Sequence, residues 1–98
     1  MGPKQIKVDY KIHSQERYLE RFKKSMNDLD YIELCEIGKD DSKGFLLEQV
    51  KRGAKRKVVL FNGDYVWCVF SGKKRILKTV YVVPIKVLKR IKTNIDIL

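Results

Sequence analysis

The chain has 98 residues, of which 44% are hydrophobic and 35% are charged, a composition typical of one small globular domain rather than of a disordered chain. Lysine and arginine outnumber aspartate and glutamate by 22 to 12, and the net charge of +10 favours an anionic partner, although a lysine-rich proteome would produce the same excess. No apolar run approaches the length of a membrane-spanning helix, and the N-terminus lacks the apolar core of a signal peptide. One histidine and two separated cysteines cannot form an ordinary structural zinc site. We therefore expect a cytoplasmic protein with buried free thiols, no membrane segment, no metal and no cofactor.

The N-terminal part of the chain predicts an extended segment followed by a helix. Residues 4–12 alternate between apolar and polar side chains, as a half-buried strand or an extended lead-in does. Ser14 is a suitable N-cap, and from residue 15 to about 25 the apolar period is helical. The apolar stripe of this helix consists of Tyr18, Leu19, Phe22 and Met26.

A second helix is expected after Asn27-Asp28, which interrupts the first pattern and can cap a new helix. Gly38 is a plausible C-terminal stop. A strand is the competing assignment for residues 31–36, because these residues also alternate. The rough apolar face of the helix consists of Leu29, Ile32, Leu34 and Ile37.

The rest of the chain predicts an antiparallel sheet. Asn62-Gly63 is the strongest hairpin signal in the sequence, and Pro84 ends the last strand. The expected strands are residues 45–51, 57–61, 64–70 and 75–83. The predicted fold class is therefore α+β, with two N-terminal helices packed on a four-stranded antiparallel sheet. Residues 1–98 would form one domain, with a core at about 10–83 and a basic helix or tail at 84–98.

Three cationic or titratable side chains recur at a spacing of four in the first helix: His13, Arg17 and Arg21. This spacing places them along one side of a helix, where neighbouring cations repel, so helix stability alone does not favour them. A bound phosphate would neutralise the two guanidiniums, and histidine is a candidate acid or base near neutral pH. The alternatives are a junction histidine bonded to backbone and a solvated helix face with arginines paired to acidic side chains.

Basic residues also gather at the expected strand connections, which in a meander can lie at one end of the sheet. Hairpin turns are commonly charged, so each group alone is a weak signal. We assign as nucleic-acid-binding candidates Arg52, Lys55, Arg56, Lys73, Lys74 and Arg75. The aromatic side chains available for base stacking, or alternatively for the core, are Tyr65, Trp67, Phe70 and Tyr81.

The last expected strand contains Thr79 and Tyr81. If these residues share a face with Leu77, a hydroxyl and a phenol point the same way and can hydrogen-bond a phosphate or an oxyanion. Ordinary β-propensity is the alternative explanation for both residues.

The chain resembles a small bacterial and phage domain family that is similar to the RelE/ParE toxins. The features that carry the resemblance are the helix motif H-x-x-x-R-x-x-x-R at 13–21, the four strands and the closing Thr79-Val80-Tyr81. More distantly the chain resembles the barnase–EndoU–colicin–RelE group of metal-independent ribonucleases. The resemblance covers residues 10–83, although Phe22-Lys23 stands where family members often have Gly-Ile.

The resemblance implies RNA cleavage by attack of the 2′-hydroxyl on the adjacent phosphate. His13 would be the base or acid, Arg17 and Arg21 would bind the phosphate, and Thr79 and Tyr81 would complete the catalytic site. We therefore expect a toxin-like endoribonuclease, with an acidic antitoxin or immunity protein as a partner. Two alternatives stay open because fold does not determine activity: a non-catalytic module for nucleic acid or nucleotides, such as a phage-encoded effector, and a basic protein-interaction domain.

Overall fold

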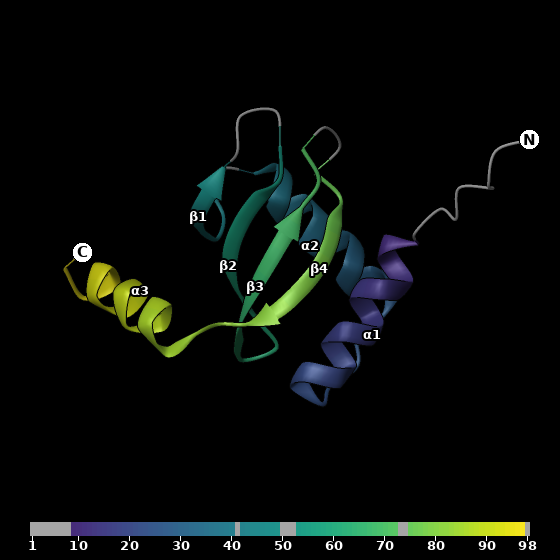
Figure 1. Cartoon of the computed structure of the whole chain (residues 1–98), viewed down its shortest axis with the longest axis horizontal. Coiled ribbons are helices and arrows are strands. Elements are labelled where there is room, and N and C mark those ends of the chain that lie inside the picture. The colour runs from purple at the N-terminus through teal and green to yellow at the C-terminus, as the bar shows by residue number, and fades with distance from the viewer. Residues whose placement is uncertain (1–8, 41, 50–52, 73–74, 98) are drawn as a thin grey trace, which may run out of the picture.

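The computed structural model describes residues 9–40, 42–49, 53–72 and 75–97 (Figure 1). In chain order the elements are α1 (Tyr10–Phe22), α2 (Asp28–Lys39), β1 (Phe45–Gln49), β2 (Lys55–Phe61), β3 (Asp64–Phe70), β4 (Leu77–Val82) and α3 (Ile85–Ile97). The strands form one antiparallel sheet in the order β1-β2-β3-β4. The predicted α+β class, with two helices before a four-stranded antiparallel sheet and a helix after it, is confirmed. None of the helices in the described part of the chain is long and apolar enough to span a membrane.

α1 begins earlier than the sequence pattern indicated. The Asp9 carboxylate accepts hydrogen bonds from the backbone N–H groups of Lys11 and Ile12, at 3.1 and 3.2 Å, and thereby caps the helix. The expectation of extended structure is therefore wrong for residues 10–12, and residues 4–8 lie outside the described residues. Ser14 is not the N-cap but a buried residue of the second turn, whose hydroxyl donates to the Leu77 carbonyl at 3.3 Å.

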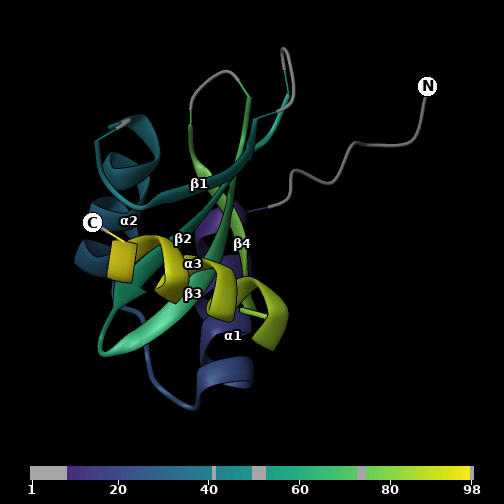
Figure 2. The ribbon, with the colours of Figure 1, turned by 90° about the vertical axis from the view of Figure 1, so that its left-hand side faces the viewer.

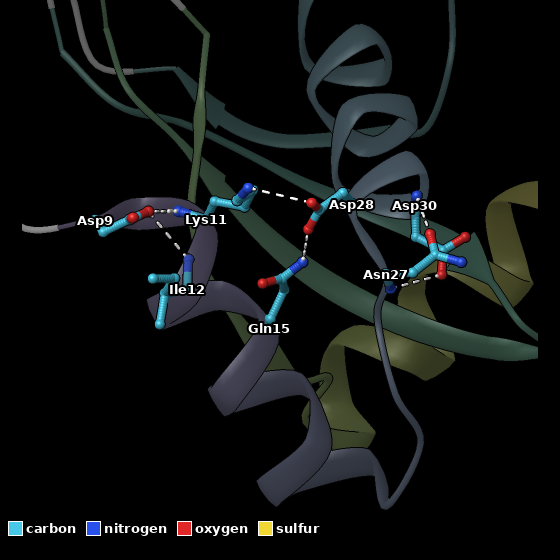
Figure 3. Close-up of polar contacts among 7 residues, drawn as sticks. All are labelled: Asp9, Lys11, Ile12, Gln15, Asn27, Asp28 and Asp30. Carbon is cyan, nitrogen blue, oxygen red and sulfur yellow. Dashed lines mark hydrogen bonds and ion pairs between the residues drawn. The ribbon is translucent and has the colours of Figure 1, made fainter.

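α2 is a helix, as preferred from sequence, and Asn27 caps it as expected. The Asn27 side chain accepts from the backbone N–H of Asp30, and the Asp30 carboxylate accepts from the backbone N–H of Asn27, which forms a reciprocal capping box (Figure 3). Figure 3 also shows how α1 is held to α2, because Lys11 and Gln15 both donate to the Asp28 carboxylate.

The buried face of α2 differs from the predicted one. Leu29 and Ile32 are 75% and 55% exposed, whereas the side turned to the sheet carries Tyr31, Leu34 and Gly38. Gly38 does not stop the helix, which continues to Lys39. The Gly38 position instead needs the absence of a side chain, since the Phe70 ring fills the space where a Cβ would lie.

The β2–β3 hairpin forms at Asn62-Gly63, as predicted, and both residues have the positive φ that a type I′ turn requires. Further along the sheet, the pairing between β3 and β4 contains a bulge: Val69 lies opposite Thr79 and Phe70 opposite Leu77, so Lys78 is an extra residue. The bulge shifts the alternation of side chains on β4 by one position.

The main core lies between the sheet and the two N-terminal helices. Its members include Tyr18, Leu34, Phe61, Val66, Cys68, Phe70, Leu77 and Val80. A second, smaller cluster lies on the opposite sheet face, where Val58, Val83 and Ile91 are buried together. α3 crosses this opposite face (Figure 2). The sheet is thus covered by α1 and α2 on one side and by α3 on the other.

Candidate nucleic-acid interface

Arg21 connects α1 to the edge of the sheet. β4 is an edge strand, so its outward carbonyl groups lack a neighbouring strand as a hydrogen-bond partner. Arg21 Nη1 donates to one of them, the Val80 carbonyl, at 3.1 Å. The same guanidinium lies 4.8 Å from the centre of the Tyr81 ring, which is within the range of a cation–π interaction. Two of the five proposed catalytic residues are therefore in contact.

The other members of the helix motif lie apart from this contact. Four residues advance a helix by about 40° more than one full turn, so the row rotates away from β4 toward its N-terminal end. Arg17 instead pairs with Glu20, at 2.8 Å on the exposed side of α1. His13 is half-buried, and its imidazole makes no hydrogen bond or ion pair within the described part of the chain. It stands two turns before Arg21, about 12 Å along the helix axis.

Thr79 and Tyr81 share a sheet face, but Leu77 does not share it with them. Thr79 pairs with Val69 and Tyr81 with Trp67, on the face turned away from α1 and α2. Leu77 is fully buried in the main core on the helical face, because the bulge at Lys78 reverses the alternation. Tyr81 is 44% exposed, so its ring is accessible beside the Arg21 guanidinium.

The basic run in β2 divides between the two faces of the sheet. Lys55 is only 3% exposed, and its ammonium lies 3.5 Å from the Gly38 carbonyl, so this residue belongs to the interior rather than to an exposed basic surface. Arg56 lies on the outer face, in one cross-strand row with Val69 and Thr79. The reason is the two-residue period of a strand, which turns alternate side chains of a basic run inward.

Lys57 is the second inward-facing lysine, at 1% exposure. Its ammonium donates to the carbonyls of Ile37, Asp40 and Lys43 at 2.7–3.0 Å. These carbonyls belong to the C-terminal end of α2 and the loop after it, where the helix supplies few donors, and those of Ile37 and Asp40 also accept from the backbone N–H groups of Asp40 and Lys43. Lys57 therefore acts as a structural cap for α2.

Of the remaining nucleic-acid-binding candidates, Arg75 is described and Arg52, Lys73 and Lys74 lie outside the described residues. Arg75 has a φ of 53° and is half-buried, just before β4. Its Nη1 is buried, without a hydrogen-bond partner among the described residues.

A cleft of about 420 Å³ lies at the end of the sheet next to Arg21. It is lined by Arg21, Phe22, Gly63, Asp64, Tyr65, Val82, Val83 and Leu88. Its acidic residue, Asp64, forms an ion pair with Lys24 at 2.7 Å, and the hydrogen bond to Asp64 raises the pKa of the Lys24 ammonium. With that charge balanced, Arg21 makes the cleft suitable for an anion. Residues from the end of α1 and from α3 both line this cleft. The spacing of residues in the sequence did not indicate that these two helices lie close together.

Charge is divided between the two halves of the chain, a feature that counting by segment would have shown from sequence alone. Residues 9–41, which include α1 and α2, contain nine acidic and six basic residues. Residues 42–98, which include the sheet and α3, contain 14 basic and three acidic residues. The excess of positive charge thus belongs to residues 42–98, the strands, their connections and α3 together, and a polyanion is attracted to that half.

The cysteines and acidic groups do not form an additional site in the described part of the chain. Both cysteines are free, and burial raises the pKa of the Cys68 thiol, as expected for a thiol inside the core. Cys35 is half-buried, and its sulfur accepts from the Leu77 N–H at 3.4 Å. The described residues contain no group of three or more histidine, cysteine, aspartate or glutamate side chains that could hold a metal ion.

Comparison of the chain with protein-family models, with curated proteins and with solved structures finds no match.

Proposed function

We propose that the protein binds RNA at the α1–β4 edge, where Arg21 and Tyr81 meet. The observation that carries the proposal is the Arg21 guanidinium of α1, which lies 4.8 Å from the exposed phenol ring of Tyr81 on β4. β4 belongs to the basic part of the chain, residues 42–98. Unpaired RNA bases stack on aromatic rings and arginine planes, and guanidiniums bind phosphate with paired N–H groups. One Arg21 N–H bonds Val80, and a guanidinium has five such donors, so others can bind a phosphate.

Two further features support this ligand class. Thr79 and Arg56 lie in one cross-strand row of the face that carries Tyr81, so a hydroxyl and a second guanidinium belong to the same sheet face as the aromatic ring. The likeness of the helix and strand motifs to the RelE/ParE toxins points to the same ligand.

Binding is tested with fluorescently labelled single-stranded RNA and fluorescence anisotropy across a salt series. The wild-type protein should bind with an affinity that falls linearly as salt rises on logarithmic axes. Loss of one stacked base is worth about 1–3 kcal/mol, so Tyr81→Ala should weaken binding by about 5- to 150-fold. Arg21→Ala should also weaken it, whereas Lys23→Ala, an exposed cation beyond the end of α1, is the matched control. If RNA, DNA and nucleotides all fail to bind at low salt, the proposal is rejected in favour of a basic protein-interaction domain.

The second candidate function is metal-independent endoribonuclease activity of the toxin type. It is favoured by His13, which is the only histidine and lies on the same helix as Arg21 without a polar partner in the described residues. An acid or base must reach the proton it transfers, and about 12 Å of helix separates His13 from Arg21, so the geometry favours binding over cleavage of a phosphate held by Arg21.

Cleavage is measured with naked RNAs of varied sequence and with ribosome-bound mRNA. A ribonuclease should lose turnover in His13→Ala but keep its RNA affinity, and its expression should slow growth. Intact RNA of both kinds after incubation with the wild-type protein would exclude this activity while leaving the binding proposal standing. An acidic antitoxin or immunity protein would be expected to compete with RNA for the basic half of the molecule.

A further inference from the structure

We infer that α3 is a second RNA-contacting element, which binds the phosphate backbone of the strand whose base stacks at Tyr81. This inference rests on the proposed function and extends it, because it names where the rest of the RNA lies. The contacting side chains would be Lys86, Lys89 and Arg90, all of them exposed.

α3 is amphipathic, with its two sides clearly assigned by the structure. Ile91 is 2% exposed and packs with Val58 and Val83, while Val87 and Leu88 pack against the same cluster. Residues 86, 89 and 90 are separated by three and four positions, so they lie together on the opposite side of the helix. The apolar side thus attaches α3 to the sheet, and the basic side is turned to solvent.

Helix stability does not explain Lys86 and Arg90. Residues 85–95 contain no acidic residue, so these two side chains have no acidic i,i+3 or i,i+4 neighbour within that segment. Like charges at this spacing repel by a few tenths of a kcal/mol, and Lys86 lies in the first turn, where the helix dipole disfavours a cation. Exposed cations that lower the stability of α3 are explained if they bind an external polyanion.

The position of α3 allows one RNA strand to contact both the α1–β4 edge and α3. Leu88 lines the same cleft as Arg21, so the cleft leads from the α1–β4 edge to α3. α3 also crosses the sheet face to which Thr79 and Tyr81 belong (Figure 2). A strand that places a base on Tyr81 can therefore continue along the cleft to the basic side of α3.

The test is the salt dependence of RNA binding by the triple variant K86Q/K89Q/R90Q, measured on a single strand long enough to reach both elements. Each phosphate contact contributes about 0.7 to the slope of log affinity against log salt, so the triple variant should lower the slope by up to about 2. The control K11Q/K23Q/K39Q removes the same charge from the α1–α2 half, where all but one of the exchanged side chains are exposed, and should keep the wild-type slope. A mononucleotide, which can occupy one contact only, should bind the triple variant and the wild type alike.

Failure of the inference and failure of the proposed function give different results. If the wild type binds no RNA at low salt, the proposed function fails. If Tyr81→Ala weakens RNA binding but the triple variant and the control triple have equal slopes, the function stands and the role of α3 is rejected. A basic amphipathic helix can also bind an anionic membrane surface. Loss of binding to phosphatidylserine vesicles in the triple variant, with an unchanged RNA slope, would therefore also overturn the inference.

Discussion

The contact between Arg21 and Tyr81 makes a quantitative prediction for folding stability. The guanidinium makes one hydrogen bond to the Val80 carbonyl, at 3.1 Å, and a cation–π contact at 4.8 Å. Because Tyr81 is 44% exposed, the cation–π contribution belongs at the low end of its range, about 0.5–1 kcal/mol. A charge-assisted hydrogen bond contributes about 1.5–3 kcal/mol, and water can reach the edge carbonyl after its loss. Arg21→Ala should therefore cost about 2 kcal/mol, of which only the cation–π part depends on Tyr81.

A double-mutant cycle isolates that part. Urea unfolding of wild type, Arg21→Ala, Tyr81→Ala and the double variant should show a coupling free energy of about 0.5–1 kcal/mol. Tyr81→Phe is the control for this cycle. It keeps the aromatic ring and should therefore leave the cation–π contact intact. A coupling below about 0.3 kcal/mol, the ordinary error of additivity, would refute the reasoning that these two residues form one unit.

Three further predictions concern the framework around the interface. Gly38→Ala gains about 1 kcal/mol of helix propensity, but its Cβ would lie less than 3.0 Å from three atoms of the Phe70 ring, and overpacking this close costs about 2–3 kcal/mol, the upper part of the usual range. Chemical denaturation should thus show a net loss of about 1–2 kcal/mol that Phe70→Leu partly reverses, and an equally stable Gly38→Ala would contradict the packing. Lys57→Met should lower the free energy of unfolding by about 2 kcal/mol, because three partly buried carbonyls lose a charged donor, although those of Ile37 and Asp40 keep a backbone donor; unchanged urea unfolding would argue against its capping role. Hydrogen bonds from Gln15 and a lysine depress the pKa of Asp28, so its stabilisation is present above its unfolded-state pKa and is lost as pH falls through the folded one. Thermal melts below about pH 4 should therefore fall less steeply for Asp28→Asn than for wild type, and parallel curves would count against this linkage.

Local signals in the sequence determined the order and the type of most elements. Asn27 caps α2 through a capping box, whose two hydrogen bonds join only the side chains and backbone N–H groups of Asn27 and Asp30. Asn62-Gly63 makes the β2–β3 turn because both residues tolerate positive φ. The strands follow from β-branched residues at the correct period. These features are decided within a few residues, so they can be read without knowledge of the fold.

The same local reasoning was wrong at two helix ends. Ser14 was expected to cap α1, but Asp9 caps it, and the Ser14 hydroxyl instead donates to the Leu77 carbonyl of β4. Glycine is a residue type that often ends a helix, but at position 38 it is required because the Phe70 ring leaves no space for a Cβ. In each case a residue type typical of a helix end is used for a long-range contact.

The candidate interface depended most on tertiary structure. Sequence spacing placed His13, Arg17 and Arg21 on one helix side, but of these three only the Arg21 side chain hydrogen-bonds β4 within the described residues, because a row at intervals of four rotates around the helix axis. The bulge at Lys78 determines the side chains that share a sheet face with Tyr81. Strand alternation likewise turns Lys55 and Lys57 inward and Arg56 outward. The sequence alone therefore determined the charge, the N-cap of α2, the hairpin and the helix motif, whereas only the tertiary structure decided which cations meet an aromatic ring at the surface, because that depends on rotation and register rather than on residue type.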